Sequence, residues 1–538
     1  MTSTAVATTC GEALIALLER RGVEVVFGIP GVHTLELYRG LAHSSIRHIT
    51  PRHEQGAAFA ADGYARVARR PGVCLLITGP GVTNAATAVA SAYHDSQPLL
   101  IISSATASTD AGRGRGPLHD LPDQQALMAT ITAFSETVRS PAQLPGALDR
   151  AFAVLEGPRP RPVHIGIPID VLAMPGDEPL GAPPASAPPR PTPPGAQLQR
   201  AADLLAAARE PIILLGGGAI DAGDAALALS ALTGAPIATT GNGKGAVPER
   251  HPAALGVTLT LQPVYDALER ADAVLAVGTE LSEVDYYYQP QLPRFAGALI
   301  RVDVDEAQLH SGRPATIAIH GDAGDTLAAL TRLLEARDHG DRSERAAERA
   351  LALRGALAWW PGAESMFSIL DALSPALGPD AIIASDSTQL AYVANSYLPV
   401  GRPRSYLCPA GFGTLGPALP MAIGAKLAAP DRPVACLVGD GGLLFTVAEL
   451  ATAAQLGLPI AVIVWNNHGY GEIRDSMDHA HVPHIATDAS APDLLSLARG
   501  LGAAATQIDR MEAIAGAVGD ALGADRPTLI ELPATLAR

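Results

Sequence analysis

The chain has 538 residues, 48% of them hydrophobic, and a formal net charge of −16. At roughly 150 residues per domain, this length predicts three or four domains. The acidic balance argues against nucleic-acid binding, and no apolar run reaches the roughly 18 residues that a membrane-spanning helix needs. The four cysteines form no CxxC pair, so neither a zinc site nor a disulfide framework is indicated. Because the N-terminus lacks a signal peptide, we expect a cytoplasmic protein. Because the net charge argues against nucleic acid, we expect a small-molecule ligand.

The first part of the chain alternates apolar strand-like runs with helical patterns, which predicts βαβ units and a parallel sheet. Residues 23–27 run into a turn that contains Pro30 and Gly31, and residues 73–78 run into a Gly-Pro-Gly turn at 79–81. We place this first domain at residues 1–172. The Pro- and Ala-rich stretch 171–197 reads as an extended linker over the surface.

Two further α/β units follow. The second, at residues 198–335, has expected strands at 211–215, 273–277 and 298–302. We interpret its Gly-Gly-Gly turn at 216–218 as chain geometry, and a site for a nucleotide phosphate is the alternative. The charged stretch 337–349 predicts an exposed connecting helix. The third unit, at residues 358–538, begins with a strand near 381–384 and closes with a strand at 528–532. The predicted fold class is therefore α/β, with three consecutive doubly wound parallel-sheet domains.

A candidate metal site lies in the third unit. Asp440 follows one expected strand, and Asn467 ends another. Their side-chain oxygens, with the backbone carbonyl of Gly469, form the sparse oxygen set that suits Mg²⁺ when phosphate oxygens and water complete the octahedron. Three neighbouring glycines would let a diphosphate approach the backbone and the N–H groups of the following helix: Gly439, Gly441 and Gly442. The alternative is an ordinary strand-to-helix turn.

Residues 52–57 read Arg-His-Glu-Gln-Gly-Ala, and residues 63–66 read Gly-Tyr-Ala-Arg. With the motif around Asp440, they make the chain resemble, over nearly its full length, the acetolactate synthase and pyruvate oxidase branch of the thiamine-diphosphate (ThDP) enzymes. The resemblance implies pyrimidine, central and diphosphate domains in that order. It also implies ThDP and Mg²⁺ as cofactors, with each active site shared between two subunits of a homodimer or homotetramer.

Within this resemblance, Glu54 matches the activating glutamate. A carboxyl group held against N1′ of the aminopyrimidine can share a proton with the ring, whose imino group then takes the proton from thiazolium C2. The alternative for Glu54 is an acid stabilised at a helix N-terminus. Leu415 would hold the two rings of the cofactor in a bent conformation. The resemblance implies further cofactor contacts at Pro30, Gly31, Ser387, Thr388, Gln389 and Gly413.

Two departures from the pattern of the family bear on the reaction. Residues 278–286 carry acids where the flavin of acetolactate synthase would lie, so FAD is not expected. Pyruvate decarboxylases have a Leu-His-His sequence where this chain reads Leu118-His119-Asp120. His119, with Asp120 in place of the second histidine, could protonate the carbon left by CO₂ loss and so release an aldehyde. The alternative for His119 is a surface residue of a Gly- and Arg-rich loop.

The substrate is expected to be a 2-oxo acid. Glu472 and Asp475 lie one helical turn apart after the metal loop, and with Asp120 they could receive a cationic tail; a solvated acidic helix face paired with Arg474 is the alternative. The loops resemble those of 5-guanidino-2-oxopentanoate (2-ketoarginine) decarboxylases, which implies 4-guanidinobutanal as product. A carboligase of the acetolactate synthase type remains an alternative. An inactive regulatory homologue would require loss of Glu54 or of the metal motif.

Overall fold

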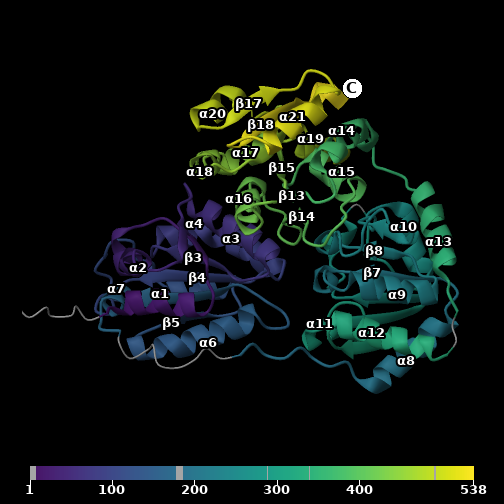
Figure 1. The fold of residues 1–538 in the computed structure, drawn as a ribbon, viewed down its shortest axis with the longest axis horizontal. Coiled ribbons are helices and arrows are strands. Elements are labelled where there is room, and N and C mark those ends of the chain that lie inside the picture. Colours follow the sequence, from purple (N-terminus) through teal and green to yellow (C-terminus); the bar gives the residue numbers. More distant parts are fainter. Residues whose placement is uncertain (1–7, 177–185, 288, 338–339, 490–491, 538) are drawn as a thin grey trace, which may run out of the picture.

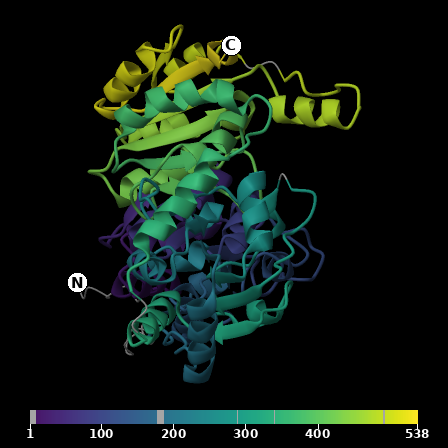
Figure 2. The same cartoon turned by 90° about the vertical axis from the view of Figure 1, so that its right-hand side faces the viewer.

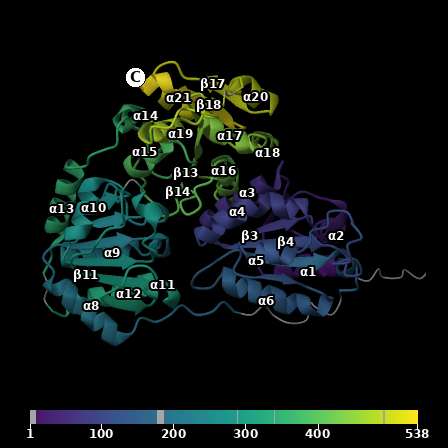
Figure 3. The same cartoon turned by 180° about the vertical axis from the view of Figure 1, so that it is seen from behind.

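The computed structural model describes residues 8–176, 186–287, 289–337, 340–489 and 492–537. They form three α/β units, each built on a parallel six-stranded sheet (Figure 1). Each sheet falls inside one of the three expected domain ranges, whose limits stay predictions. The third unit lies across the other two, as Figures 1 and 3 show from opposite sides. The predicted fold class is confirmed.

The first sheet has the strand order β2-β1-β3-β4-β6-β5. Its strands are β1 (Val25–Gly28), β2 (Arg47–Ile49), β3 (Gly72–Leu76), β4 (Leu99–Ala105), β5 (Ser135–Thr137) and β6 (Val163–Pro168). The helices around it are α1 (Cys10–Arg20), α2 (Leu35–Leu41), α3 (Glu54–Ala68), α4 (Pro80–His94), α5 (Gln124–Ala129), α6 (Leu144–Leu155) and α7 (Ile169–Leu172). The central strands β1, β3, β4 and β6 are almost fully buried because helices cover both faces of a parallel sheet, whereas the short edge strands β2 and β5 carry polar residues and are only partly buried.

The second sheet has the order β12-β11-β10-β7-β8-β9. Its strands are β7 (Pro211–Leu215), β8 (Ile237–Thr239), β9 (Ala254–Gly256), β10 (Ala273–Val277), β11 (Ala298–Asp303) and β12 (Ile317–His320). Its helices are α8 (Gly195–Ala207), α9 (Gly223–Thr233), α10 (Gln262–Arg270), α11 (Glu306–His310) and α12 (Ala323–Glu335). A Cβ at Gly216 would lie 2.2 Å from the carbonyl oxygen of Gly278, so close packing of two turns accounts for the glycines at 216–218.

The third sheet has the order β14-β13-β15-β16-β18-β17. Its strands are β13 (Ile382–Ser385), β14 (Tyr406–Leu407), β15 (Val434–Gly439), β16 (Ile460–Asn466), β17 (Ala504–Gln507) and β18 (Thr528–Pro533). Its helices are α14 (Phe367–Leu377), α15 (Gln389–Tyr397), α16 (Ala418–Ala428), α17 (Asp440–Thr446), α18 (Glu449–Gln455), α19 (Gly471–His479), α20 (Leu494–Gly500) and α21 (Ala513–Leu522). Helix α19 projects from the body of the molecule (Figure 2).

The connections differ in part from expectation. Residues 186–194 form neither helix nor strand and are mostly exposed, as expected for the linker, whereas residues 177–185 lie outside the described part of the chain. The connecting helix is α13 (Ser343–Gly355), and the prediction that it is exposed was wrong for one face. Ala346 and Ala350 are buried, and Arg349 donates hydrogen bonds to the carbonyls of Pro211 and Gly234. Arg345 and Arg354 of the same helix also donate hydrogen bonds to backbone carbonyls of the second unit, so small side chains and three arginines dock the helix there.

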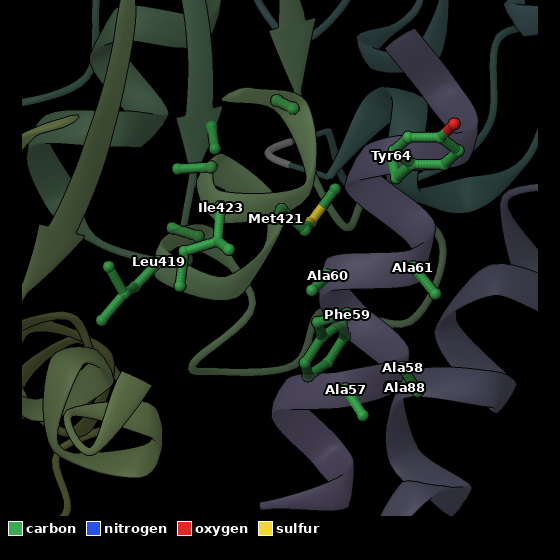
Figure 4. Close-up of a cluster of buried hydrophobic side chains, with 14 of the residues drawn as sticks. Ala57, Ala58, Phe59, Ala60, Ala61, Tyr64, Ala88, Leu419, Met421 and Ile423 are labelled. Atoms are coloured by element: carbon green, nitrogen blue, oxygen red, sulfur yellow. The ribbon is translucent and has the colours of Figure 1, made fainter. Parts of the chain in front are cut away.

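One hydrophobic core joins the first and third units. Helices α3 and α16 pack against each other with side chains that include Phe59, Tyr64 and Met421 (Figure 4). The helices approach closely because a Cβ at Gly63 would lie 2.2 Å from the carbonyl oxygen of Met421, and a Cβ at Gly424 would lie 1.9 Å from that of Ala60. No helix in the described ranges is long and apolar enough to span a bilayer.

Candidate functional site

Asp440 and Asn467 lie at the same edge of the third sheet. Strands β15 and β16 are adjacent and parallel, with Gly439 aligned with Trp465, so the chain segments that follow both strands leave the sheet together. Asp440 is buried, and its Oδ2 accepts a hydrogen bond from the backbone N–H of Gly469 at 2.9 Å. Burial raises the pKa of Asp440, because desolvation disfavours its charged form.

Three oxygen atoms converge at this edge. Asn467 Oδ1 lies 2.7 Å from the carbonyl oxygen of Gly469 and 3.2 Å from Asp440 Oδ1. Ligand oxygens about 2.1 Å from an octahedral cation stand about 3.0 Å apart, so both of these distances suit neighbouring ligands of one cation. Among the described residues, no group of three His, Cys, Asp or Glu side chains could hold a metal. One carboxylate, one amide and one carbonyl therefore form the donor set that could hold a divalent cation.

Gln389 determines which way the amide of Asn467 points. Asn467 Nδ2 donates to Gln389 Oε1 at 3.0 Å, while Gln389 Nε2 donates to Asp475 Oδ2 at 2.5 Å. If the Asn467 amide were turned over, its nitrogen would donate to Gly469 O and Asp440 Oδ1, but its oxygen would face Gln389 Oε1 at 3.0 Å. Because Asp475 already holds the Gln389 amide group, we assign the orientation that leaves Asn467 Oδ1 facing the other two oxygens.

The glycines around Asp440 allow three side chains to approach the backbone. A Cβ at each of these positions would lie 2.8 to 2.9 Å from a neighbouring side chain: Thr388 for Gly439, Tyr470 for Gly441 and Asp386 for Gly442. Such distances are too short for any residue with a Cβ. Thr388 thus stands beside the Asp440 turn and Gln389 beside Asn467, whereas their contact with a diphosphate stays a prediction.

Buried Asp386 ties the loop of Leu415 to this turn. Its carboxylate accepts hydrogen bonds from the backbone N–H groups of Ser387 at 2.9 Å and Gly416 at 3.0 Å. Burial raises the pKa of Asp386 to about 6, although these hydrogen bonds act in the opposite direction. Leu415 is half-buried in this loop, and Gly413 before it has a φ of +62°. Sequence reasoning missed Asp386, although an acid directly after a strand was a usable signal.

The other end of the Leu415 loop is held by a buried ionic cluster at the junction of the three units. Arg66 pairs with Asp62 at 2.7 Å and with Asp95 at 2.9 Å. Asp95 Oδ1 also accepts hydrogen bonds from Asn242 Nδ2 of the second unit and from the backbone N–H of Gly411 in the third. One carboxylate therefore connects α4 to both other units.

Glu54 is the first residue of α3, at the edge of the first sheet. Its Oε2 accepts a hydrogen bond from Asn84 Nδ2 on α4 at 2.9 Å. Buried Glu449 on α18 accepts hydrogen bonds from the backbone N–H groups of Arg52 and His53 at 3.0 and 3.1 Å. A side chain of the third unit thus positions the start of the helix that carries Glu54. The role of Glu449 was not predicted, because nothing in the local sequence indicates its distant partners.

His119 lies beside the same part of the first unit. The backbone of Gly79 approaches it so closely that a Cβ there would lie 2.3 Å from the His119 carbonyl oxygen. The φ of His119 is +66°, in the left-handed region that non-glycine residues rarely adopt. Its ring lies 5.2 Å from that of His33, a residue the sequence analysis did not select. Asp120 is exposed and accepts a hydrogen bond from Thr106 at 2.8 Å.

The turn predicted at Pro30 and Gly31 is present after β1. Gly31 and Thr34 bond to each other at 3.0 Å through the Thr34 hydroxyl. A Cβ at Gly31 would lie 2.5 Å from Ile77 Cδ1. Pro30 is exposed. This turn therefore leads directly into the short 3₁₀ helix Val32–Thr34, which carries His33.

The two acids of α19 have different surroundings. Asp475 is bonded to Gln389, whereas Glu472 is half-buried, and its pKa is raised by burial and then by Asp475. The pKa of Tyr392 is raised to about 12, chiefly by burial and to a smaller degree by neighbours that include Glu472. The Tyr392 phenol therefore lies near the Glu472 carboxyl group. Arg474 does not neutralise these acids, because it donates to the Asn467 carbonyl and pairs with Asp488.

Known proteins match the chain in three consecutive parts. Residues 8–127 match the N-terminal TPP binding domain of thiamine pyrophosphate enzymes, residues 198–330 the central domain, and residues 386–532 the C-terminal TPP binding domain. The first part contains Glu54 and His119, and the last contains Asp440 and Asn467.

Curated relatives match over almost the whole chain. It is 48% identical to the "Probable 2-ketoarginine decarboxylase" of Pseudomonas aeruginosa, over 98% of this chain and 95% of that protein. It is 34% identical to the acetolactate synthase large subunit of Mycobacterium tuberculosis, over 97% and 87%. It is 32% identical to the acetolactate synthase isozyme 1 large subunit of Escherichia coli, over 93% and 89%. The chain therefore belongs to the thiamine pyrophosphate (thiamine diphosphate) enzymes.

Proposed function

We propose that the protein is a ThDP- and Mg²⁺-dependent enzyme that converts a 2-oxo acid to an aldehyde and CO₂ without oxidation. The observation that carries this proposal is the convergence of Asp440, Asn467 and Gly469 oxygens at one sheet edge, in a chain that also has Glu54. Bound ThDP would supply an electron-accepting thiazolium ring for the loss of CO₂. The three oxygens would hold Mg²⁺, which in turn would bind the diphosphate.

The remaining residues would orient the cofactor and move protons. Glu54 would exchange a proton with the pyrimidine ring, and Leu415 would support the bent conformation of the two rings. His119 would give a proton to the carbon that has lost CO₂, which favours release of an aldehyde. FAD is not part of this proposal, since acids occupy residues 278–286 where acetolactate synthases would bind it.

The proposed substrate is 5-guanidino-2-oxopentanoate, and the product is 4-guanidinobutanal. Support comes from the name of the relative at 48% identity and from half-buried Glu472, whose carboxylate suits a guanidinium group. Asp475 would also orient Gln389, because its Oδ2 accepts a hydrogen bond from Gln389 Nε2. Asp120 stays a weaker candidate, because it is exposed and bonded to Thr106.

A carboligase is the second candidate, because acetolactate synthases match the chain at 32% and 34% identity. The deciding experiment measures CO₂ release from a panel of 2-oxo acids with ThDP and Mg²⁺, and identifies the products by mass spectrometry. 4-Guanidinobutanal from 5-guanidino-2-oxopentanoate supports the proposal. Acetolactate from pyruvate, without aldehyde, would assign the chain to the carboligases. No turnover of any 2-oxo acid would favour an inactive homologue.

We also propose a cytoplasmic homodimer or homotetramer in which Glu54 of one subunit and Asp440 of another serve the same cofactor. Large apolar side chains near both halves of the site are exposed, as expected for a surface that a partner covers: Val32, Leu35, Phe412 and Phe445. The test mixes inactive Glu54→Gln and Asp440→Ala chains after dissociation. Random pairing into dimers should restore about a quarter of wild-type activity. No recovery, despite mixed dimers on native mass spectrometry, would mean that each site lies within one chain.

A further inference from the structure

Two histidines from separate parts of the first unit meet beside the candidate site. His33 lies on the 3₁₀ helix Val32–Thr34, and His119 lies in the loop before α5. Their rings are 5.2 Å apart at an interplanar angle of 66°. The Nδ1 atoms of both rings are buried, and neither has a hydrogen-bond partner within the described structure. Two buried nitrogens without hydrogen bonds, in rings that contact each other, are costly and call for an explanation.

The pair lies next to the glutamate expected to activate the cofactor. The turn at residues 79–81 contacts His119 through Gly79, where a Cβ would lie 2.3 Å from the His119 carbonyl oxygen. Two residues further, a Cβ at Gly81 would lie 3.6 Å from Glu54 Oε1. The segment that begins α4 therefore touches both the His119 backbone and the Glu54 carboxyl group, which places the histidine pair near the proposed active site.

We infer that His33 is a positioning residue for His119 and exchanges protons with it, so that the two imidazoles together deliver the proton that completes decarboxylation. This inference rests on the proposed function. The overall reaction, R–CO–COO⁻ + H⁺ → R–CHO + CO₂, consumes one proton. The bond between the two carbons breaks, and its electrons form a new C–H bond with the proton from His119. His33 then returns a proton to His119, and solvent replaces it.

The charged groups around His33 and His119 favour a histidine pair that carries one proton rather than two. On the neighbouring elements, three acids are already engaged: Glu54 with Asn84, Asp120 with Thr106, and Glu36 with Arg39. Burial, and then repulsion from His119, lowers the pKa of His33. Two imidazolium groups at this distance repel each other, so protonation of one favours loss of the proton from the other.

The activity test separates loss of CO₂ from the proton transfer that follows. An electron-accepting dye, 2,6-dichlorophenolindophenol, can intercept the electron-rich carbon before it is protonated. We expect His33→Gln to lower aldehyde formation about tenfold or more while dye-coupled consumption of the 2-oxo acid is retained. His119→Gln should show the same shift, and the double variant should be no worse than the worse single variant. His48→Gln is the control, because it removes a similar ring contact, with Tyr38 at 5.0 Å, elsewhere in this unit.

The second test needs neither substrate nor cofactor. Histidine side chains labelled with ¹³C at Cε1 are titrated by NMR in the apo-protein, and the pKa of His33 is compared between wild type and His119→Gln. A rise in the variant supports the coupled pair. An unchanged pKa of His33 would overturn the proposal, as would equal losses of aldehyde formation and dye-coupled turnover in His33→Gln. If wild type decarboxylates nothing, the proposed function fails, whereas this titration still decides whether the pair is coupled.

Discussion

The orientation of one amide should control how tightly the protein binds its cation. In the described structure, Asn467 Oδ1 faces Gly469 O and Asp440 Oδ1 because Gln389 accepts a hydrogen bond from Asn467 Nδ2. Replacing Gln389 with leucine removes this acceptor at similar volume. The Asn467 amide is then free to turn over and donate to Gly469 O at 2.7 Å and to Asp440 Oδ1 at 3.2 Å.

The expected loss of cation affinity in the Gln389→Leu variant follows from the two hydrogen bonds that a cation would then have to break. At about 1 kcal/mol each, they oppose binding by about 2 kcal/mol, or about 30-fold in affinity. This agrees with the roughly 10- to 100-fold losses seen when groups that orient a metal ligand are removed. The assay is calorimetric titration of apo-protein with ThDP at a series of Mg²⁺ concentrations. The Gln389→Leu chain should need about 30 times more Mg²⁺ for half-maximal ThDP binding.

Two further variants sharpen the test. Gln125→Leu removes a glutamine that bonds to Thr137 away from the site, and it should leave the Mg²⁺ requirement unchanged. Asn467→Asp presents an oxygen in either orientation, so Gln389→Leu should cost little affinity in that background. If Gln389→Leu requires no more Mg²⁺ than wild type, or loses as much affinity in the Asn467→Asp background, the amide does not orient the ligand.

Three other predictions concern activation, stability and pH. Glu54→Gln should retain ThDP binding but lower CO₂ release at least about 100-fold; undiminished turnover would contradict its role. Arg66→Met leaves the buried carboxylates of Asp62 and Asp95 unpaired, so urea unfolding should show a loss of about 3–5 kcal/mol, and a loss below about 1 kcal/mol would contradict the ionic cluster's role in stability. Burial lowers the pKa of His164, between Ser103 and Ser135, to about 3. Because unfolding then takes up a proton below pH about 6.5, stability should fall by about 2 kcal/mol from pH 7 to pH 5. His164→Gln should remove that part of the slope, and equal slopes would show that His164 does not titrate on unfolding.

The strands and the cation motif could be predicted from the sequence because their signals are local. Apolar runs bounded by glycine turns mark β7, β10 and β15, since both faces of a parallel sheet are buried. Asp440 and Asn467 follow two such strands, and parallel neighbours bring their carboxyl ends to one edge. Given the pattern of the family, Glu54 could likewise be proposed from the residues beside it, and its role stays a prediction.

Contacts between distant segments could be found only in the tertiary structure. The sequence suggested that Asp120 replaced a second histidine, but the ring beside His119 belongs to His33, which lies on another element. Asp475 was expected to bind substrate, yet it holds Gln389, which orients Asn467. These partners are separated by tens of residues and follow no helical or strand period, so no local pattern records them. The sequence by itself determined which chemical groups the site contains, whereas the packing of the three units decided which of them touch.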